Sequence, residues 1–282
     1  DENTICIVPI AGCTWTGMND DIEALDKEVS KFNKATGNQL CIHVDAASGG
    51  FILPFLKPHV KWDFRLDNVL SISTSGHKYG LVYPGLGWVI WRDKKYIPSE
   101  MSFSVNYLGA DITQVGLNFS RPAAQVLGQY YQFIRLGFQG YKAIQQNSMD
   151  IAEYLHEEIG KMPQFKNYST EIVNPLFIWS LNPKYDKVAN WTLYDLQYKL
   201  QQNGWMVPAY TLPKDLEQCV VMRIVCRQGF SRDMADMLLN DIRMAVADLE
   251  KLSYPTQSRV EVNRNNHPKQ SFNHGGKHSC KN

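Results

Sequence analysis

HVDAASGG (residues 43–50) and SISTSGHKYG (71–80) are the two stretches from which the fold of this chain can be read. The first stretch overlaps the apolar run CIHVDA (41–46), and the second overlaps the apolar run VLSIS (69–73). After its apolar run, each stretch continues in small residues and glycine. This pattern predicts two buried strands that each end in a tight loop. Asp45 ends the first strand, and Lys78 lies in the loop after the second. Because ligands bind at the carboxyl ends of parallel strands, we expect both side chains at one cleft.

The flanking segments favour a parallel sheet. TICIVPI (4–10) predicts another buried strand, and residues 18–37 after it carry apolar side chains at helical spacing. We expect Asp20 to cap this helix and Gly37 to end it. A strand, a helix and a strand form a βαβ unit, whose strands are parallel. With GWVIW (87–91) as a further buried strand, the sequence predicts an α/β fold with a mostly parallel sheet covered on both faces.

The remainder of the chain predicts a long helix and a second, smaller domain. Residues 93–119 are rich in loop-forming residues, and a helical stretch runs from about 122 to 161 with a break near 137–140. Residues 164–252 then alternate between strands (around 176–181 and 220–226) and helices (192–203 and 232–252). Apolar residues nearly vanish after Ser253, which is typical of a flexible tail. We therefore expect four parts: a sheet domain (1–121), a linking helix region (122–163), a small C-terminal α/β domain (164–252) and a tail (253–282).

Charge and cysteine content narrow the class of protein. Among 282 residues, 29 Lys and Arg balance 28 Asp and Glu, which gives a net charge of +1. We therefore expect neither nucleic acid nor an acidic membrane surface as a partner, and no apolar run is long enough to predict a transmembrane helix. The six cysteines include no CxxC pair, which favours reduced thiols in a cytoplasmic protein. The missing initial Met and leader suggest a processed chain or a fragment.

Lys78 and Asp45 suit an aldehyde-bearing pyridine ring. A lysine among small polar residues could form a Schiff base with an aldehyde. A carboxylate at a buried strand end needs a partner, such as a pyridinium N–H, because burying an unpaired charge is costly. Ala46, Ala47 and Ser48 would let a flat ring approach the backbone. The alternatives are a solvated loop lysine and an aspartate that only caps the following turn.

Cys41, His43 and Asp45 leave a metal site open as another interpretation. These residues alternate along one strand and would share one of its faces. No second cluster of ligands has the spacing typical of a metal site, so buried thiols are the simpler interpretation.

These motifs resemble those of a known family. Together with WDFRL (62–66), GWVIWR (87–92), NFSRP (118–122) and VMRIVCR (221–227), they are similar to the glutamate decarboxylases of the group II pyridoxal-phosphate-dependent decarboxylases. The similarity runs from Asp1 to about Leu252, and HVDAASGG with SGHK is specific as a pair. The resemblance implies a fold-type I enzyme whose large domain is incomplete here, because the family's chains begin well upstream of Asp1.

The resemblance also implies which residues hold pyridoxal 5'-phosphate. Lys78 would bind it as a Schiff base, Asp45 would pair with the ring nitrogen and Ala47 would pack against the ring. Three further contacts would come from Thr14 near the ring, His77 at the phosphate and Ser120 at the phosphate of the partner subunit. From the residues alone, Thr14 could be only a turn residue and Ser120 only a helix cap.

Substrate contacts are implied in the same way. Tyr107 would lie on a mobile loop over the neighbouring subunit's site and could supply a proton to Cα of the substrate. Arg223 would bind a substrate carboxylate from the small domain. Tyr107 could instead be a packed loop aromatic. Arg223 could pair with a structural carboxylate, because a buried arginine needs an anion, and Arg227 competes with it on the same strand face.

The implied activity is decarboxylation of L-glutamate to 4-aminobutyrate and CO2. The enzyme would be a homodimer or larger homo-oligomer, since Ser120 and Tyr107 would serve the neighbour's site. Another amino-acid decarboxylase or aminotransferase, or a cofactor-free scaffold, remain alternatives. His274 in SFNH loosely resembles a tail segment that plugs the site of some bacterial relatives, with a simple solvated tail as the alternative. The sequence has no amphipathic basic helix of the kind that binds calmodulin in plant relatives.

Overall fold

The computed structural model of the chain describes residues 3–105, 112–115 and 121–265. The chain divides into two compact units. The first comprises Asp1–Tyr154, Ser169–Phe177 and Val225–Arg232, and the second comprises Leu155–Tyr168, Ile178–Ile224 and Asp233–Asn282. Each unit therefore combines segments that are far apart in the sequence, whereas the sequence predicts consecutive domains.

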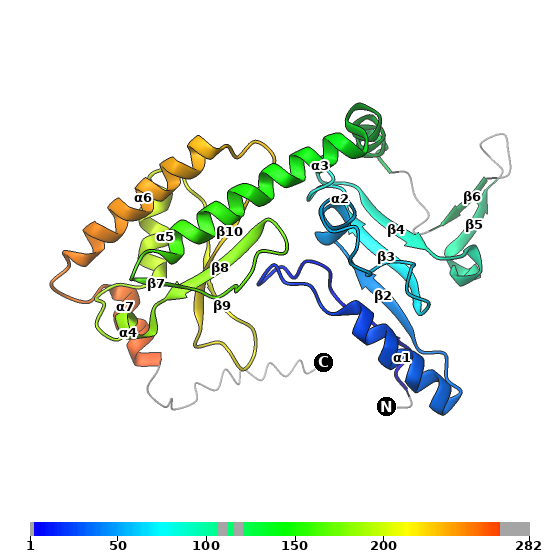
Figure 1. Ribbon diagram of the computed structural model, residues 1–282, viewed down its shortest axis with the longest axis horizontal. Helices are drawn as coiled ribbons and strands as arrows, with labels where there is room; N and C mark the ends of the chain where they lie inside the picture. Colours follow the sequence, from blue (N-terminus) through cyan, green and yellow to red (C-terminus); the bar gives the residue numbers. More distant parts are fainter. Residues whose placement is uncertain (1–2, 106–111, 116–120, 266–282) are drawn as a thin grey trace, which may run out of the picture. The chain divides into compact units, whose positions relative to one another are not determined.

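The first unit is built on a four-stranded sheet with the strand order β1-β2-β3-β4. Figure 1 shows β2, β3 and β4 of this sheet side by side. Its strands are β1 (Cys6–Ile7), β2 (Cys41–Asp45), β3 (Val69–Ser75) and β4 (Gly87–Trp91). The first three strands are parallel, and β4 pairs with β3 antiparallel. No helix lies between β3 and β4 to carry a parallel crossover, which explains the reversed direction of β4. The α/β class is confirmed, and the sheet is mixed.

Helix α1 (Ile22–Thr36) connects β1 to β2 and confirms the βαβ unit. Its N-cap is Asp21, whose side chain accepts the Ala24 N–H at 3.0 Å. The predicted cap, Asp20, was wrong, because its carboxylate instead accepts the Ile10 N–H at 2.7 Å. The predicted end is confirmed, since Gly37 adopts φ 75°, the left-handed conformation that ends many helices.

The core of this unit lies along the two central strands. Ile42 and Val44 of β2 and Val69 and Ile72 of β3 are buried, and α1 packs on them through Val29. Each such side chain stabilises the fold by roughly 1.5–3 kcal/mol. Short helices η1 (Gly49–Phe51) and α2 (Leu53–Leu56) connect β2 to β3 and add to the buried surface.

The edge strands are more exposed than the sequence predicts. GWVIW was expected to be buried, but Val89 of β4 is 56% exposed. Only Cys6–Ile7 of the expected strand 4–10 forms β1, and Ile5 beside it is 82% exposed. Both predictions of burial were wrong because β1 and β4 each have one neighbouring strand, and an apolar run does not reveal whether its strand is central or at an edge.

The segment that was expected to be loops contains regular elements. After η2 (Lys94–Tyr96) and η3 (Ser99–Met101), β5 (Ser102–Val105) pairs antiparallel with β6 (Ile112–Val115). Helix α3 (Ala124–Gly160) follows and confirms the predicted long helix. Its backbone is non-helical at Gly137, with φ 56°, which confirms the predicted break.

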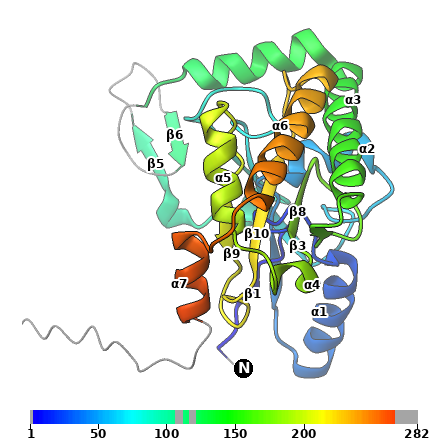
Figure 2. The same ribbon diagram turned by 90° about the vertical axis from the view of Figure 1, so that its left-hand side faces the viewer.

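The second unit contains the other sheet, with the order β7-β8-β10-β9. The strands are β7 (Phe165–Asn167), β8 (Leu176–Leu181), β9 (Ala209–Thr211) and β10 (Val220–Val225). The β7/β8 and β9/β10 pairs are antiparallel. Helices α5 (Leu193–Gln202) and α6 (Arg232–Glu250) lie on the same side of β10 (Figures 1 and 2). The predicted strands and helices β8, β10, α5 and α6 are confirmed, whereas the three-residue strands were too short to be recognised.

An ordered helix lies within the segment that the sequence predicts to be a tail. After α4 (Pro183–Asp186) and the elements above, α7 (Gln257–Asn265) forms the last described element. Arg259 of α7 is only 4% exposed, and its Nη2 atom lies 2.7 Å from Asp186 Oδ1 and 2.6 Å from the Trp191 carbonyl oxygen. One buried arginine with three hydrogen bonds thus fixes a helix that has little apolar surface.

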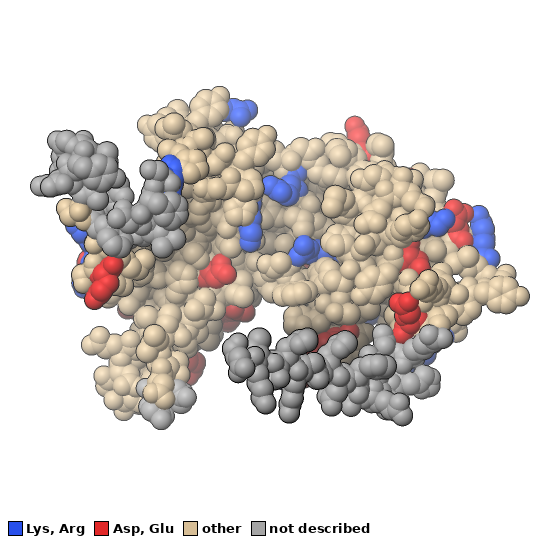
Figure 3. Space-filling view, turned by 180° about the vertical axis from the view of Figure 1, so that it is seen from behind, with Lys and Arg blue, Asp and Glu red and all other residues tan. Residues whose placement is uncertain are grey.

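Charged side chains are dispersed over one face of the molecule (Figure 3). On the face shown in Figure 3, Lys and Arg are scattered among Asp, Glu and neutral residues. Among the described residues, no helix combines the length and the apolar character needed to cross a membrane.

Candidate active site

The site predicted from sequence lies at the carboxyl ends of β2 and β3. In these parallel strands Asp45, the last residue of β2, pairs with Ser73, which lies two residues before the end of β3. The pairing continues beyond the end of β2, because the Ala46 N–H donates to the Ser73 carbonyl at 2.9 Å and the Ser75 N–H donates to the Ala47 carbonyl at 3.2 Å. The loop after Asp45 and the loop that carries Lys78 therefore begin side by side.

Lys78 reaches from its loop back to the loop after β2. Its backbone N–H donates to the Ser75 carbonyl at 3.3 Å, which closes a turn directly after β3. Its half-buried side chain places Nζ 3.5 Å from Ser48 Oγ. Ser48 is buried and lies three residues after Asp45. The Lys78 amine thus contacts the loop that follows Asp45.

The Asp45 carboxylate is held in position by the backbone. Its Oδ1 atom accepts the Ala47 N–H at 3.0 Å, which is the turn-capping role that the sequence left open. The Asp45 main chain also accepts the Ala11 N–H at 2.9 Å and donates to the Pro9 carbonyl at 3.0 Å. These bonds fix the position of the carboxylate at the strand end.

Small residues allow two loops and strand β3 to meet at this point. Gly12 has φ 94°, and a Cβ atom there would lie 2.9 Å from the Cβ of Ser48. A Cβ at Gly49 would lie 2.7 Å from the Ala11 carbonyl oxygen, and one at Gly50 would overlap Thr74 Oγ1. The GCTWTG segment after β1 therefore packs directly on the loop after β2, which only glycine at these positions permits.

Two buried glutamines of α3 donate hydrogen bonds to the loop that carries Lys78. Gln145 Nε2 donates to the Tyr79 carbonyl at 2.8 Å, and Gln129 Nε2 donates to the Gly80 carbonyl at 2.7 Å. The Tyr141 hydroxyl also donates to the Gly80 carbonyl, at 2.9 Å, and burial raises the pKa of Tyr141 to about 12. Sequence reasoning missed these residues, because the break at Gly137 disturbs the helical periodicity that would place them on one face.

The other predicted residues differ in their placement. His77 is half-buried beside Lys78, and its carbonyl accepts a hydrogen bond from Arg227 Nη2 at 3.2 Å. Thr14 is exposed in the turn of the GCTWTG segment. Arg223 belongs to the second unit, where its guanidinium lies 5.6 Å from the centre of the Tyr210 ring. Arg227, the second arginine that the sequence offered, thus contacts the lysine loop.

Three residues with predicted roles lie outside the described part of the chain. They are Tyr107, Ser120 and His274.

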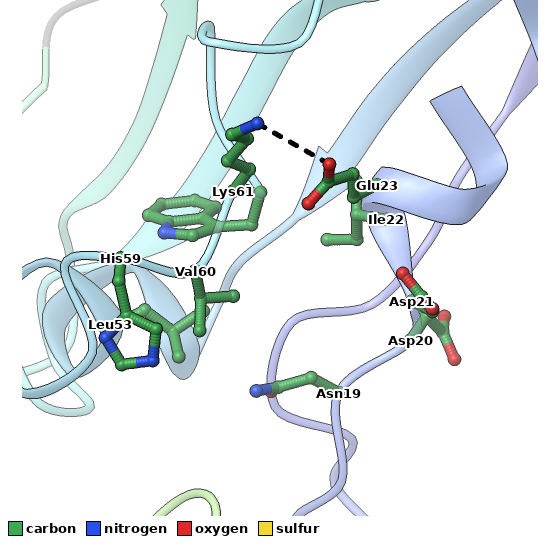
Figure 4. A pocket seen from close by; sticks show the side chains of 10 residues that line it. Asn19, Asp20, Asp21, Ile22, Glu23, Leu53, His59, Val60 and Lys61 are labelled. Atoms are coloured by element: carbon green, nitrogen blue, oxygen red, sulfur yellow. Dashed lines mark ion pairs between the residues drawn. The ribbon is translucent and has the colours of Figure 1, made fainter. Parts of the chain in front are cut away.

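A separate cavity of about 310 Å³ lies at the start of α1 (Figure 4). It is lined by Asp20, Asp21 and Glu23, among others, and Lys61 Nζ lies 3.5 Å from Glu23 Oε1. Because the first two carboxylates accept backbone N–H groups and the third pairs with lysine, these acids serve the local fold. None of the predicted catalytic residues lines this cavity.

Known proteins resemble this chain over most of its length. Residues 1–181 match the family described as the pyridoxal-dependent decarboxylase conserved domain. The chain is 49% identical over 251 residues to a glutamate decarboxylase of Lactococcus lactis and 47% identical over 249 residues to glutamate decarboxylase beta of Listeria monocytogenes. These alignments cover 89% and 88% of this chain and 53% of each relative, so the chain spans about half the length of the curated relatives it matches.

The fold is likewise that of a solved relative. The structure of a Lactobacillus brevis glutamate decarboxylase superimposes with a TM-score of 0.85 at 48% identity, and the match covers 89% of this chain and 57% of that one. Because the family match includes the Asp45 and Lys78 loops and extends over more than half of the sequence, this chain belongs to the pyridoxal-dependent decarboxylase family.

Proposed function

We propose that this chain carries the carboxy-lyase site for the conversion of L-glutamate to 4-aminobutyrate and CO2. The observation that carries the proposal is the contact between Lys78 Nζ and Ser48 Oγ at adjoining strand ends, next to Asp45. The choice of glutamate rests on relatives named as glutamate decarboxylases that share 47–49% identity over nearly nine-tenths of the chain.

The residues present fit the pyridoxal cofactor that gives the family its description. Lys78 supplies an amine and Asp45 a carboxylate, which are the two groups that an aldehyde-bearing pyridine needs. Thr74 Oγ1 is buried and, within the described residues, lacks a hydrogen-bond partner. Gly49 and Gly50 let the loop that carries Ser48 pack closely on the Ala11 carbonyl and on Thr74. His77, Thr14, Ala47 and, from the partner subunit's loop, Ser120 would add contacts to the phosphate and ring.

The protein's own residues would direct the chemistry. Pyridoxal phosphate, when bound, supplies the electron sink for the pair of electrons left on Cα when CO2 departs. Asp45 would hold the proton on the ring nitrogen, and Lys78 would bind the cofactor through its ε-amino group. Arg223 would bind and orient a carboxylate of the substrate, since a guanidinium binds a carboxylate through two hydrogen bonds. Tyr107 would deliver the proton to Cα, which separates decarboxylation from transamination.

Borohydride trapping tests this proposal on the chain itself. The protein is incubated with pyridoxal phosphate, reduced with borohydride and mapped by peptide mass spectrometry. We expect the pyridoxyl group on Lys78, and its loss in Lys78→Ala with retention in the exposed control Lys95→Ala. Pyridoxyl groups spread evenly over the surface lysines would exclude Lys78 as the cofactor site. That result would favour a protein that has the fold but binds no cofactor.

Substrate choice needs a second measurement. Release of CO2 is followed with glutamate, aspartate and aromatic amino acids as substrates. We expect glutamate to be preferred by at least tenfold. If the pyridoxyl group is trapped on Lys78 but CO2 is released from another amino acid, the site is that of a different decarboxylase. Transfer of the amino group without release of CO2 would indicate an aminotransferase.

We also propose that the protein acts in the cytoplasm as a homodimer or a multiple of dimers. The first half of α3 supports an interface, because its apolar side chains form an exposed stripe at four-residue spacing. Val126, Tyr130 and Ile134 follow one row of the helix, and Leu127 and Tyr131 lie beside it. Leu127, Tyr130 and Ile134 are each more than 60% exposed. An apolar face of this kind is typical of an interaction surface.

A further inference from the structure

Cys6 of β1 and Cys41 of β2 are directly paired neighbours in these two parallel strands. Neighbouring strands lie roughly 4.8 Å apart. The Cα atoms of disulfide-bonded cysteines lie roughly 4.4–6.8 Å apart. The backbone therefore already holds these cysteines at a separation that a disulfide can bridge.

The sulfur atoms also point toward the same stretch of backbone. Cys41 Sγ lies 3.6 Å from the Ile5 carbonyl oxygen, one residue before Cys6, and Cys6 Sγ lies 3.5 Å from the Ile7 carbonyl oxygen. Both side chains are partly exposed, so a small reagent can reach them. Burial raises the pKa of the Cys41 thiol to about 11, with a further contribution from the neighbouring Cys6 thiol.

A shared metal ion is not supported at this pair. His43, two residues along β2, has Nδ1 2.7 Å from Ser71 Oγ and Nε2 3.2 Å from Ser73 Oγ. Both ring nitrogens are therefore engaged within the sheet. In the described ranges, no group of three or more His, Cys, Asp and Glu side chains could hold a metal ion.

We propose that Cys6 and Cys41 form an oxidisable dithiol that a small disulfide, such as glutathione disulfide, converts to an intramolecular disulfide. The Cys6 thiolate attacks the glutathione disulfide and releases one glutathione. The Cys41 thiolate then attacks the Cys6 sulfur of this mixed disulfide and releases the second glutathione. The two protein thiols lose two protons and two electrons, which leave on the two glutathione thiols.

The order of attack follows from the local structure. Cys6 lies on the two-residue edge strand, where the adjacent Ile5 is almost fully exposed. Cys41 is a thiol with a raised pKa, so little of it is thiolate near neutral pH and it resolves the mixed disulfide slowly. We therefore expect closure of the disulfide to accelerate as the pH rises from 7 to 9.

A disulfide here would connect β1 to the strand that carries Asp45. The two strands stay paired beyond Cys41, since the Asp45 N–H donates to Pro9 and its carbonyl accepts from Ala11. Oxidation would fix the edge strand that bounds the Asp45 loop, and fraying of β1 would become slower. Oxidation of this pair does not depend on the proposed decarboxylase activity.

The test is thiol chemistry on the native chain. The protein is incubated with glutathione disulfide and digested without reduction, and the peptides are mapped by mass spectrometry. We expect a peptide that links Cys6 to Cys41 and a decrease of two in the six free thiols. Cys41→Ser should stop at a glutathione adduct on Cys6, and Cys13→Ser should leave the linked peptide unchanged.

Two results would overturn the proposal. One is that, in the native protein, Cys6 and Cys41 each carry a glutathione and no disulfide forms between them. The other is a linked peptide whose yield in urea equals that in the native state, since pairing would then owe nothing to the sheet. The native and urea samples need no variant, so the test holds even if Cys41→Ser fails to fold.

Discussion

Lys78 Nζ lies 3.5 Å from Ser48 Oγ, although 30 residues separate the two in the sequence. The contact exists because β2 and β3 are adjacent and parallel, so that the loops after them leave the sheet at the same edge. A hydroxyl at this distance can orient the lysine amine without removing its reactivity.

Removal of this hydroxyl should weaken cofactor binding. We expect Ser48→Ala to raise the Kd for pyridoxal phosphate about fivefold, because one hydrogen bond contributes about 1 kcal/mol. Absorbance titration measures the Kd, and the exposed Ser99→Ala is the matched control. An unchanged Kd in Ser48→Ala would mean that the serine does not orient the lysine.

The buried glutamines should stabilise the lysine loop. Gln145→Leu removes the donor to the Tyr79 carbonyl and leaves that acceptor buried, so we expect a loss of about 1–3 kcal/mol in the free energy of unfolding. Urea denaturation measures the loss. The neighbour Gln146 is exposed and donates to Asp150 of the same helix, so Gln146→Leu should change stability by less than about 0.5 kcal/mol.

Tyr141 should make stability depend on alkaline pH. Its pKa is about 12 in the folded protein and about 10 when unfolded, so the folded state holds the proton more tightly. The stabilisation is complete below pH 10 and is lost as the pH rises toward 12. Urea denaturation between pH 9 and 11 should show a shallower decline for Tyr141→Phe than for the wild type.

The exposed Tyr83 provides the control for this measurement. Tyr83→Phe should follow the wild-type decline, and a Tyr141→Phe curve parallel to both would contradict the assignment.

Arg259 should fix α7 to the second unit. Arg259→Ala removes hydrogen bonds to Asp186 and Trp191, so we expect residues 257–265 to exchange amide hydrogen at least tenfold faster and to be cleaved earlier by protease. Arg259→Lys should restore little, because a lysine lacks the planar fork. Lys251→Ala, which breaks an exposed pair with Asp248, is the control that should leave exchange unchanged.

The exposed face of α3 should determine the oligomeric state. We expect Ile134→Glu to shift the protein from dimer to monomer in sedimentation analysis, because a charge in an apolar interface is costly. Val188→Glu, at an exposed apolar residue of the second unit, is the matched control. A monomeric wild type would contradict the homodimer, and a dimer that persists in Ile134→Glu would place the interface elsewhere.

The sequence by itself determined the parallel β2 and β3, the helix between β1 and β2, the break in α3 and the loops of Asp45 and Lys78. These features depend on local patterns: apolar runs, helical spacing and glycines. Gln145 was not predicted from the sequence. The contacts of Ser48 with Lys78 and of Arg227 with His77 were not predicted either, because all three contacts join residues far apart in the sequence. Asp20 shows the same limit over a shorter span, since its partner is Ile10 and not the helix that follows it.

Only the tertiary structure decided the direction and exposure of β4, the antiparallel pairs, the buried glutamines and the order in α7. An apolar run specifies that a strand forms but not which strand will pair with it, because pairing is settled by the whole sheet. Likewise, Arg259 is only one charged residue of a polar segment when the sequence is considered alone. The folded structure buries its side chain and places it within hydrogen-bond distance of Asp186 and the Trp191 carbonyl.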